Sequence, residues 1–261
     1  MSAILSQISV YPIKSCGGIA VDSWIVDELG LTLDRRWMVI DETARFQTQR
    51  WQQRLALVRP ALTPDGVLLR ADGMPELEAP PGGGAAVATA VWDEPVRTDS
   101  CGAAADRWFS EFLGASCRLV YLPDDTRRPM DGADGTTHGR VSLADAFPFL
   151  LVGEASLDDL NARLDAPVPM NRFRPNLVVH GTAPYEEDGW GRFAIGEVDF
   201  AVTRPCVRCR IPTIDQHTAE AGKEPSRTLA TYRKRPEGVI FGVNVAHAGT
   251  GRLDTGLAIR R

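Results

Sequence analysis

The sequence predicts a mainly β protein with some α+β elements, organised as two domains. The length of 261 residues fits one large domain or two small ones, at roughly 100–200 residues per domain. The 24 glycines and 18 prolines make turns frequent, which favours many short strands over long helices. The short apolar runs are spaced like the strands of a barrel or a sandwich and unlike βαβ units.

Short strands dominate the first half of the chain. Runs rich in Val, Ile, Leu and Trp predict strands over residues 4–11, 21–26, 36–40, 55–58 and 67–69. Thr-Pro-Asp-Gly at 63–66 predicts a turn between the last two. The Pro- and Gly-rich segment 79–84 predicts a loop. A helix is predicted over 103–113, because its large apolar residues share one face.

The second half combines strands with a helix. The segment 124–137 has little apolar content, which predicts a loop and a domain boundary near residue 120, hence domains 1–120 and 121–261. Ser156, with Asp159 three residues on, predicts the start of a helix that carries leucines at helical spacing. Alternating or short apolar runs predict strands over 177–179, 193–195, 198–202, 239–245 and 257–259.

Charge, hydropathy and cysteine content exclude several classes of protein. The formal net charge of −5 argues against nucleic acid as a general partner, since that binding needs a basic surface. No run approaches the roughly 20 apolar residues of a membrane span, and the N-terminus does not resemble a signal peptide. Five cysteines are an odd number, which argues against a disulfide framework. We therefore expect a cytoplasmic protein without a membrane partner.

The strongest chemical feature is the segment RPCVRCR at 204–210. Cys206 and Cys209 have three general interpretations: half of a zinc site, a redox pair, or two small buried apolar residues. A zinc site needs two further ligands, and His217 lies outside the usual spacing. The three arginines of the segment argue against the apolar interpretation, because neighbouring cations favour a thiolate. A thiolate suits a soft or highly charged metal centre.

Three other polar segments are weaker signals. Lys14 and Ser15 lie between Pro and Gly at 11–18 and offer a charge and a hydroxyl to a phosphate, although a solvated turn has the same composition. Asp34-Arg35-Arg36-Trp37 has the composition of a surface ion pair. Arg172 to Asn176 (RFRPN) either holds a polar ligand or begins a solvated strand. The histidines at 138, 180, 217 and 247 are scattered and predict no metal cluster.

Taken together, these segments resemble the MOSC superfamily of molybdenum-cofactor proteins. YPIKSCG at 11–17 and DRRWMVID at 34–41 are similar to the N-terminal MOSC β-barrel domain. The MOSC domain itself is similar to FPFLLVGEASLDDLNARL, FRPNLVV, PCVRCRIPTID, TLATYR and VIFGV in the second half. The resemblance covers almost the whole chain and implies one β-barrel domain packed on another. Within the superfamily it points to the branch of the mitochondrial amidoxime reducing component and its bacterial relatives.

The resemblance implies roles for individual residues. Cys209 takes the place of the family's molybdenum ligand. Asp215 and His217, which follow it in the sequence, are the two candidate proton donors. Cys206 matches a second family cysteine without a ligand role. The positions that match cofactor-binding residues of the family are Lys14, Ser15, Arg35, Arg50, Arg174, Asn176 and Thr213. Ala146 and Phe147 replace two small hydroxyl residues of the relatives, so cofactor contacts or substrate access are expected to differ.

The implied function is a molybdenum-dependent oxidoreductase that reduces N-hydroxylated or N-oxide-type small molecules. Its cofactor is molybdopterin without an attached nucleotide. Since no cysteine-rich iron–sulfur tail follows, the electrons are expected from a separate ferredoxin, flavoprotein or cytochrome. Two alternatives stay open: a carrier of the cofactor or of sulfur, with a persulfide on cysteine, and a β-domain binding module with structural cysteines.

Overall fold

The computed structural model describes residues 3–130 and 139–261; His138 and the end of the predicted 124–137 loop lie outside the described residues. The strands of the first half are β1 (Ile4–Val10), β2 (Ile19–Val21), β3 (Ser23–Asp27), β4 (Gly30–Leu31), β5 (Trp37–Asp41), β6 (Arg59–Thr63), β7 (Gly66–Arg70), β8 (Leu77–Ala79), β9 (Ala86–Val91), β10 (Glu94–Ser100) and β11 (Cys117–Tyr121). The strands of the second half are β12 (Phe149–Gly153), β13 (Leu177–His180), β14 (Arg192–Ile195), β15 (Val198–Val207), β16 (Lys234–Arg235), β17 (Gly238–Ala248), β18 (Gly251–Asp254) and β19 (Ile259–Arg260). The helices are α1 (Ala103–Leu113), α2 (Glu154–Asn161) and α3 (Ser226–Tyr232), with 3-10 turns η1 (Gln53–Leu57), η2 (Met170–Arg172), η3 (Glu186–Gly189) and η4 (Ile211–Thr213).

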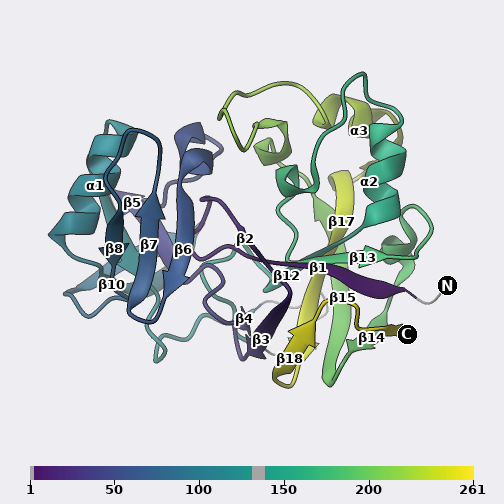
Figure 1. Ribbon diagram of the computed structural model, residues 1–261, viewed down its shortest axis with the longest axis horizontal. Helices are drawn as coiled ribbons and strands as arrows, with labels where there is room; N and C mark the ends of the chain where they lie inside the picture. Colours follow the sequence, from purple (N-terminus) through teal and green to yellow (C-terminus); the bar gives the residue numbers. More distant parts are fainter. Residues whose placement is uncertain (1–2, 131–138) are drawn as a thin grey trace.

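Figure 1 shows two lobes side by side. The first lobe contains β5 to β11 and α1, in two small sheets ordered β5-β11-β10-β9 and β6-β7-β8. Its core gathers around α1, whose predicted apolar face of Trp108, Phe109, Phe112 and Leu113 is buried. The helix ends at Gly114, where a left-handed φ of 68° lets the backbone N–H bond back to Ser110. The mainly β prediction is confirmed, and the helix prediction has the observed bounds.

The second lobe is built on a nine-stranded sheet that includes the start of the chain. Its main order is β19-β14-β15-β17-β12-β13-β1-β2, with β16 paired to β17. The strand β1 pairs antiparallel with β13, and β3 pairs with β18 near the C-terminus. Strands from both sides of residue 120 therefore share sheets. The boundary near residue 120 stays a prediction, and the sheet pairing ties the two halves into one body.

Irregular pairing between β15 and β17 marks the region where the cysteines lie. The register shifts between Val202 and Arg204 and again between Pro205 and Val207. Such bulges bend a strand and re-aim its side chains. Opposite the second shift, Gly242 has a φ of +71°, and a Cβ there would lie 2.7 Å from Val152 and 2.8 Å from the Leu151 carbonyl. Only glycine fits here, against the neighbouring strand β12, without displacement.

Several predicted boundaries were wrong. Residues 55–58 do not form a strand: Leu55 and Ala56 are buried in the 3-10 turn η1, and the strand β6 begins at Arg59. A short apolar run indicates that its residues are buried, but it does not determine whether the backbone is a strand or a helical turn. The predicted strand 21–26 is divided into β2 and β3.

The predicted helix start at Ser156 was also wrong, because α2 begins at Glu154. The Ser156 hydroxyl instead donates to the buried carboxylate of Glu187, at 2.8 and 2.9 Å from its two oxygens. Such a long-range partner outweighs the local capping preference. In the last segment, the sequence missed β18, and β19 begins only at Ile259.

Candidate active site

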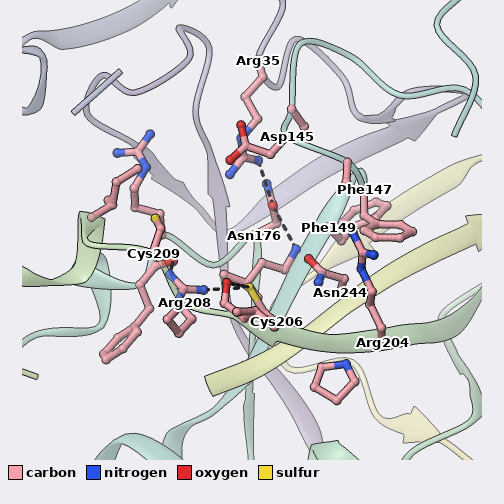
Figure 2. Close-up of a pocket in the computed structure, with 18 of the residues that line it drawn as sticks. Arg35, Asp145, Phe147, Phe149, Asn176, Arg204, Cys206, Arg208, Cys209 and Asn244 are labelled. Carbon is pink, nitrogen blue, oxygen red and sulfur yellow. Dashed lines mark hydrogen bonds between the residues drawn. The ribbon is translucent and has the colours of Figure 1, made fainter. Parts of the chain in front are cut away.

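A cavity of about 490 Å³ lies where the two lobes meet. Four of its lining residues come from the first 50 residues: Lys14, Ser15, Arg35 and Arg50. The others come from the segment before β12, the loop before β13, the end of β15 and neighbouring positions, and are Ala144, Asp145, Ala146, Phe147, Phe149, Leu150, Phe173, Arg174, Asn176, Arg204, Pro205, Cys206, Val207, Arg208, Cys209, Ile211, Glu237 and Asn244. Figure 2 shows this lining. Lys14 and Cys209, from opposite halves of the chain, therefore line the same cavity.

The end of β15 brings both thiols to the cavity. Cys206 lies on the strand and Cys209 two residues beyond its end, and both are free and half-buried. Arg208 donates from Nη1 to the Cys206 sulfur at 3.1 Å and from Nη2 to the Phe173 carbonyl at 2.8 Å, as Figure 2 shows for the first contact. Arg208 therefore fixes Cys206 against the loop before β13, while Cys209 is free of this contact.

Arg50, Asp145 and Lys14 form a charged chain beside Cys209. Asp145 pairs with Lys14 Nζ at 2.5 Å and with Arg50 Nη2 at 2.9 Å. Desolvation raises the pKa of Asp145, but the two cations outweigh it and hold that pKa well below its ordinary value. Burial lowers the pKa of Lys14 to about 8, although Asp145 opposes the shift. Burial also lowers the pKa of Arg50, but Asp145 and the Cys209 thiol beside it raise that pKa above its ordinary value.

A second polar group holds Arg35 on the opposite wall. Its guanidinium pairs with Asp34 and donates to the Asn176 side-chain oxygen at 2.9 Å. Asn176 is buried, and its amide nitrogen donates to the Ser9 carbonyl at 3.2 Å. One amide side chain thus links β1 to the loop before β13 and orients Arg35. Asn176 matches a cofactor-binding position of the family. In this structure its side chain orients Arg35, another of the matched residues.

Arg174 is buried in the same wall without an ionic partner. Its guanidinium lies 4.3 Å from the centre of the Tyr11 ring, and within residues 3–130 and 139–261 it has no hydrogen bond or ion pair. Burial lowers the pKa of Arg174. Ser15, Arg35 and Arg174 all have left-handed backbone, with φ of 69°, 49° and 58°. Non-glycine residues rarely adopt this conformation, and they concentrate at functional sites.

The cavity lining is strongly cationic in a protein of net negative charge. Two carboxylates, Asp145 and Glu237, face six cationic side chains, which are Lys14, Arg35, Arg50, Arg174, Arg204 and Arg208. Arg204 stacks at 4.8 Å over Phe147 and, like Arg174, has no ionic partner in the described part of the chain. Uncompensated guanidinium groups at a concave site favour an anionic ligand.

The comparison with known proteins agrees with this architecture. The MOSC N-terminal beta barrel domain matches residues 2–116, and the MOSC domain matches residues 138–260. The mitochondrial amidoxime-reducing component 1 of Mus musculus is 36% identical over 88% of this chain and 71% of its own length. The protein of that name from Homo sapiens is 34% identical over 88% of this chain and 72% of its own length. The chain belongs to the MOSC family.

A second type of relative shares the same two-domain region. The molybdenum cofactor sulfurase of Danio rerio is 31% identical over 94% of this MOSC chain, which spans only 32% of that longer protein. The cavity draws its lining from both matched domains: Lys14 to Arg50 lie in the first and Asp145 to Asn244 in the second. The resemblance read from the sequence is therefore confirmed at the level of the family.

Two of the predicted site residues lie outside this cavity. The Thr213 hydroxyl donates to the Arg210 carbonyl at 2.8 Å and closes the turn η4. The Asp215 carboxylate accepts from the His217 backbone at 2.8 Å and pairs with Arg172, also at 2.8 Å. The backbone N–H of His217 and the Arg172 guanidinium lower the pKa of Asp215. Asp215 thus shapes the loop after Cys209, and both residues line a separate polar groove.

Other lining residues were missed from the sequence as site residues. Asp145 pairs two of the predicted cofactor-binding cations, yet it sits in a loop with no motif to identify it. Asn244 lines the cavity from β17. The alternating apolar residues of that segment predicted a strand and gave no indication of a site residue. Ala146 and Phe147, which replace two small hydroxyl residues of the relatives, both line the cavity. Asp145 lies far from Lys14 and Arg50 in the sequence, so no local pattern indicates these ion pairs. Only the folded structure identifies Asp145 as a site residue.

Proposed function

We propose that the cavity binds the molybdenum cofactor and that the protein uses it to reduce N-oxygenated small molecules. One observation carries this proposal: a half-buried cysteine thiol and two guanidinium groups, which have no ionic partner among the described residues, line the same cavity. A thiolate is a suitable ligand for molybdenum, and guanidinium groups are suitable partners for a phosphate. The similarity to amidoxime-reducing components supports the choice of reaction.

The residues present fit this cofactor. Among the described residues, no three His, Cys, Asp or Glu side chains group together as a metal site. Of the two thiols in the cavity, Cys209 would be the protein ligand, and the dithiolene of the pterin would supply further sulfur ligands. The anionic part of the cofactor would be held by Arg174, Arg35, Ser15 and Lys14, and of these Arg174 has no ionic partner in residues 3–130 and 139–261.

The chain's own residues then have distinct tasks. When bound, the cofactor supplies the two electrons that break an N–O bond. Asp145 holds Arg50 and Lys14 against the cavity, and Arg50 lies beside the Cys209 sulfur. Lys14 Nζ, with a pKa of about 8, holds a proton that is available near neutral pH. Arg208 keeps Cys206 bound and separate from Cys209.

No helix among the described residues combines the length and the apolar character that a membrane crossing needs. As a separate proposal, the electron donor is another protein, such as a ferredoxin, a flavoprotein or a cytochrome.

The second candidate is a sulfur or cofactor carrier. The similarity to a molybdenum cofactor sulfurase and the second thiol in the cavity favour it. Cys209 would then hold a persulfide, and the cationic cavity would stabilise its negative charge.

The test is the composition and activity of the protein purified from a host that makes the cofactor. We expect stoichiometric molybdenum and pterin, and reduction of benzamidoxime to benzamidine with a chemical electron donor. Labile sulfane sulfur without molybdenum would instead establish the carrier. Absence of molybdenum, pterin and sulfane sulfur alike would leave only a binding module with structural cysteines.

A further inference from the structure

One corner of the cavity described above, here called the active cavity, presents polar side chains without partners. Arg204 on β15 and Asn244 on β17 lie opposite each other as a cross-strand pair, and both line the cavity. Within residues 3–130 and 139–261, Arg204 has neither a hydrogen bond nor an ion pair, and the Asn244 side chain has no hydrogen bond. We call this pair, together with the Phe147 ring on which Arg204 stacks, the Arg204 corner.

The local fold turns Arg204 toward the cavity and holds its guanidinium ready. The register of β15 on β17 shifts between Val202 and Arg204, and such a bulge re-aims the side chains that follow it. The Thr203 hydroxyl donates to the Asn244 carbonyl at 3.0 Å and holds the two strands together there. The guanidinium lies 4.8 Å from the centre of the buried Phe147 ring. A stacked guanidinium keeps its N–H groups free in its own plane, so they can donate to a ligand.

The Arg204 corner lies at the mouth of the cavity and apart from the residues proposed to hold the cofactor. Arg204 is exposed and Asn244 half-buried, whereas Arg174 is buried. Figure 2 shows Arg204 and Asn244 on one side of the cavity and Cys209 on the other. Because Arg174, Arg35 and Cys209 are the residues assigned to the cofactor, the Arg204 corner stays available to a second molecule that enters from solvent.

The carboxylates that line the cavity do not neutralise Arg204. Asp145 pairs with Lys14 and Arg50. Glu237, in the turn between β16 and β17, forms no ion pair in the described part of the chain. The corner therefore offers one positive charge beside the N–H donors of an amide. This combination matches a planar, singly charged carboxylate, whereas a phosphate dianion would keep one charge unpaired.

We propose that Arg204 and Asn244 bind a carboxylate group of the substrate and thereby determine the specificity of the active cavity. The inference rests on the proposed function and narrows its substrates to small molecules that carry a carboxylate apart from the reducible group. Arg204 and Asn244 bind and orient the substrate at a distance from the reacting atoms, so their contribution is to affinity.

Benzoate is a probe for this site that does not depend on turnover, and benzamide is its uncharged counterpart of the same shape. Calorimetry on protein purified from a host that makes the cofactor should show tighter binding of benzoate. Arg204→Met should weaken benzoate binding by about ten-fold or more, from the loss of a hydrogen-bonded charge, and Asn244→Leu by about two- to ten-fold. Arg204→Lys should restore part of the affinity, since it returns the charge without the planar fork.

Arg210→Met is the matched control for these variants. Arg210 belongs to the same segment and is exposed, but it does not line the cavity. Its benzoate affinity should equal that of the wild type. Thermal unfolding of every variant shows that the fold is retained.

Steady-state kinetics with a chemical electron donor give a second readout. The substrates are 4-carboxybenzamidoxime and benzamidoxime, which differ only in the carboxylate. Arg204→Met should raise KM for the acid relative to benzamidoxime by about ten-fold, with little change in the ratio of the two kcat values. A contact made equally in the ground state and the transition state changes KM and leaves kcat.

Equal benzoate affinity in Arg204→Met and Arg210→Met would overturn the carboxylate site. A loss of molybdenum in Arg204→Met as large as in Arg174→Met would also overturn it, because Arg204 would then hold the cofactor. A wild-type protein without molybdenum would contradict the proposed function, and weaker benzoate binding by its Arg204→Met variant would still establish the site. Molybdenum in the wild type with equal binding of benzoate and benzamide would contradict the carboxylate site alone.

Discussion

At the residue scale, the active cavity concentrates backbone strain and unpaired charge. Ser15, Arg35 and Arg174 hold left-handed φ values, each costing roughly 1–2 kcal/mol for a residue with a Cβ. Arg174 adds the cost of burial without an ionic partner in the described chain. Neither feature stabilises the fold. A bound anionic ligand would offset both of these unfavourable free energies.

Replacing Arg174 should separate stability from ligand binding. In Arg174→Met, we expect cofactor content to fall by about ten-fold or more, from the loss of a charge-assisted contact. The free energy of unfolding of the cofactor-free protein should stay within about 1 kcal/mol or rise, because a desolvated charge has been removed. Pterin analysis and urea unfolding measure the two quantities.

The control for this substitution is Arg45→Met, since Arg45 stacks on Trp51 outside the cavity. It should keep the cofactor content of the wild type. If Arg174→Met and Arg45→Met retained equal cofactor, Arg174 would have no part in holding it.

At the element scale, periodic segments were predictable and short apolar runs were not. The helix α1 and the strand β17 repeat their apolar residues at 3.6 and 2 positions, so their type could be read from the sequence. The four-residue run 55–58 has no such period, and tertiary burial of Leu55 decided for a 3-10 turn. Ser156 failed as a helix cap because Glu187, 31 residues away, takes its hydroxyl.

The close approach of β17 to its neighbouring strand β12 gives a prediction about Gly242. Gly242→Ala combines a left-handed backbone with a Cβ within 3 Å of Val152 and Leu151, so we expect a loss of about 2–5 kcal/mol in the free energy of unfolding. Gly249→Ala, with a φ of +81° and no atom within 4 Å of its Cβ, should lose only about 1–2 kcal/mol. Urea unfolding decides, and equal losses would show that the close approach contributes nothing.

At the scale of the whole molecule, the site depends on contacts that no local pattern contains. The resemblance identified Lys14, Ser15, Arg35, Arg50, Arg174, Asn176 and Cys209, and the fold brings all of them to one cavity. It could not supply Asp145, whose pairing with Lys14 spans 131 positions. Thr213 and Asp215 follow Cys209 closely, but η4 turns them into another groove. A position close to Cys209 in the sequence therefore did not predict a place in the cavity between the lobes.

The assignment of Cys209 as the metal ligand is a prediction from the family resemblance, and the geometry around the two thiols supports it. Cys209 lies beside Arg50, which comes from the other half of the chain, whereas Cys206 is held by its neighbour Arg208. A metal ligand cannot be replaced by a methyl group, while loss of a supporting thiol has a partial cost.

The molybdenum content of Cys209→Ala against Cys206→Ala therefore tests the central claim most directly. Both variants are purified alongside the wild type from a host that makes the cofactor, and their folding is checked by thermal unfolding. We predict that Cys206→Ala retains most of the metal and that Cys209→Ala retains almost none, with both folded. Equal molybdenum content in the two folded variants would contradict the assignment of Cys209 as the metal ligand.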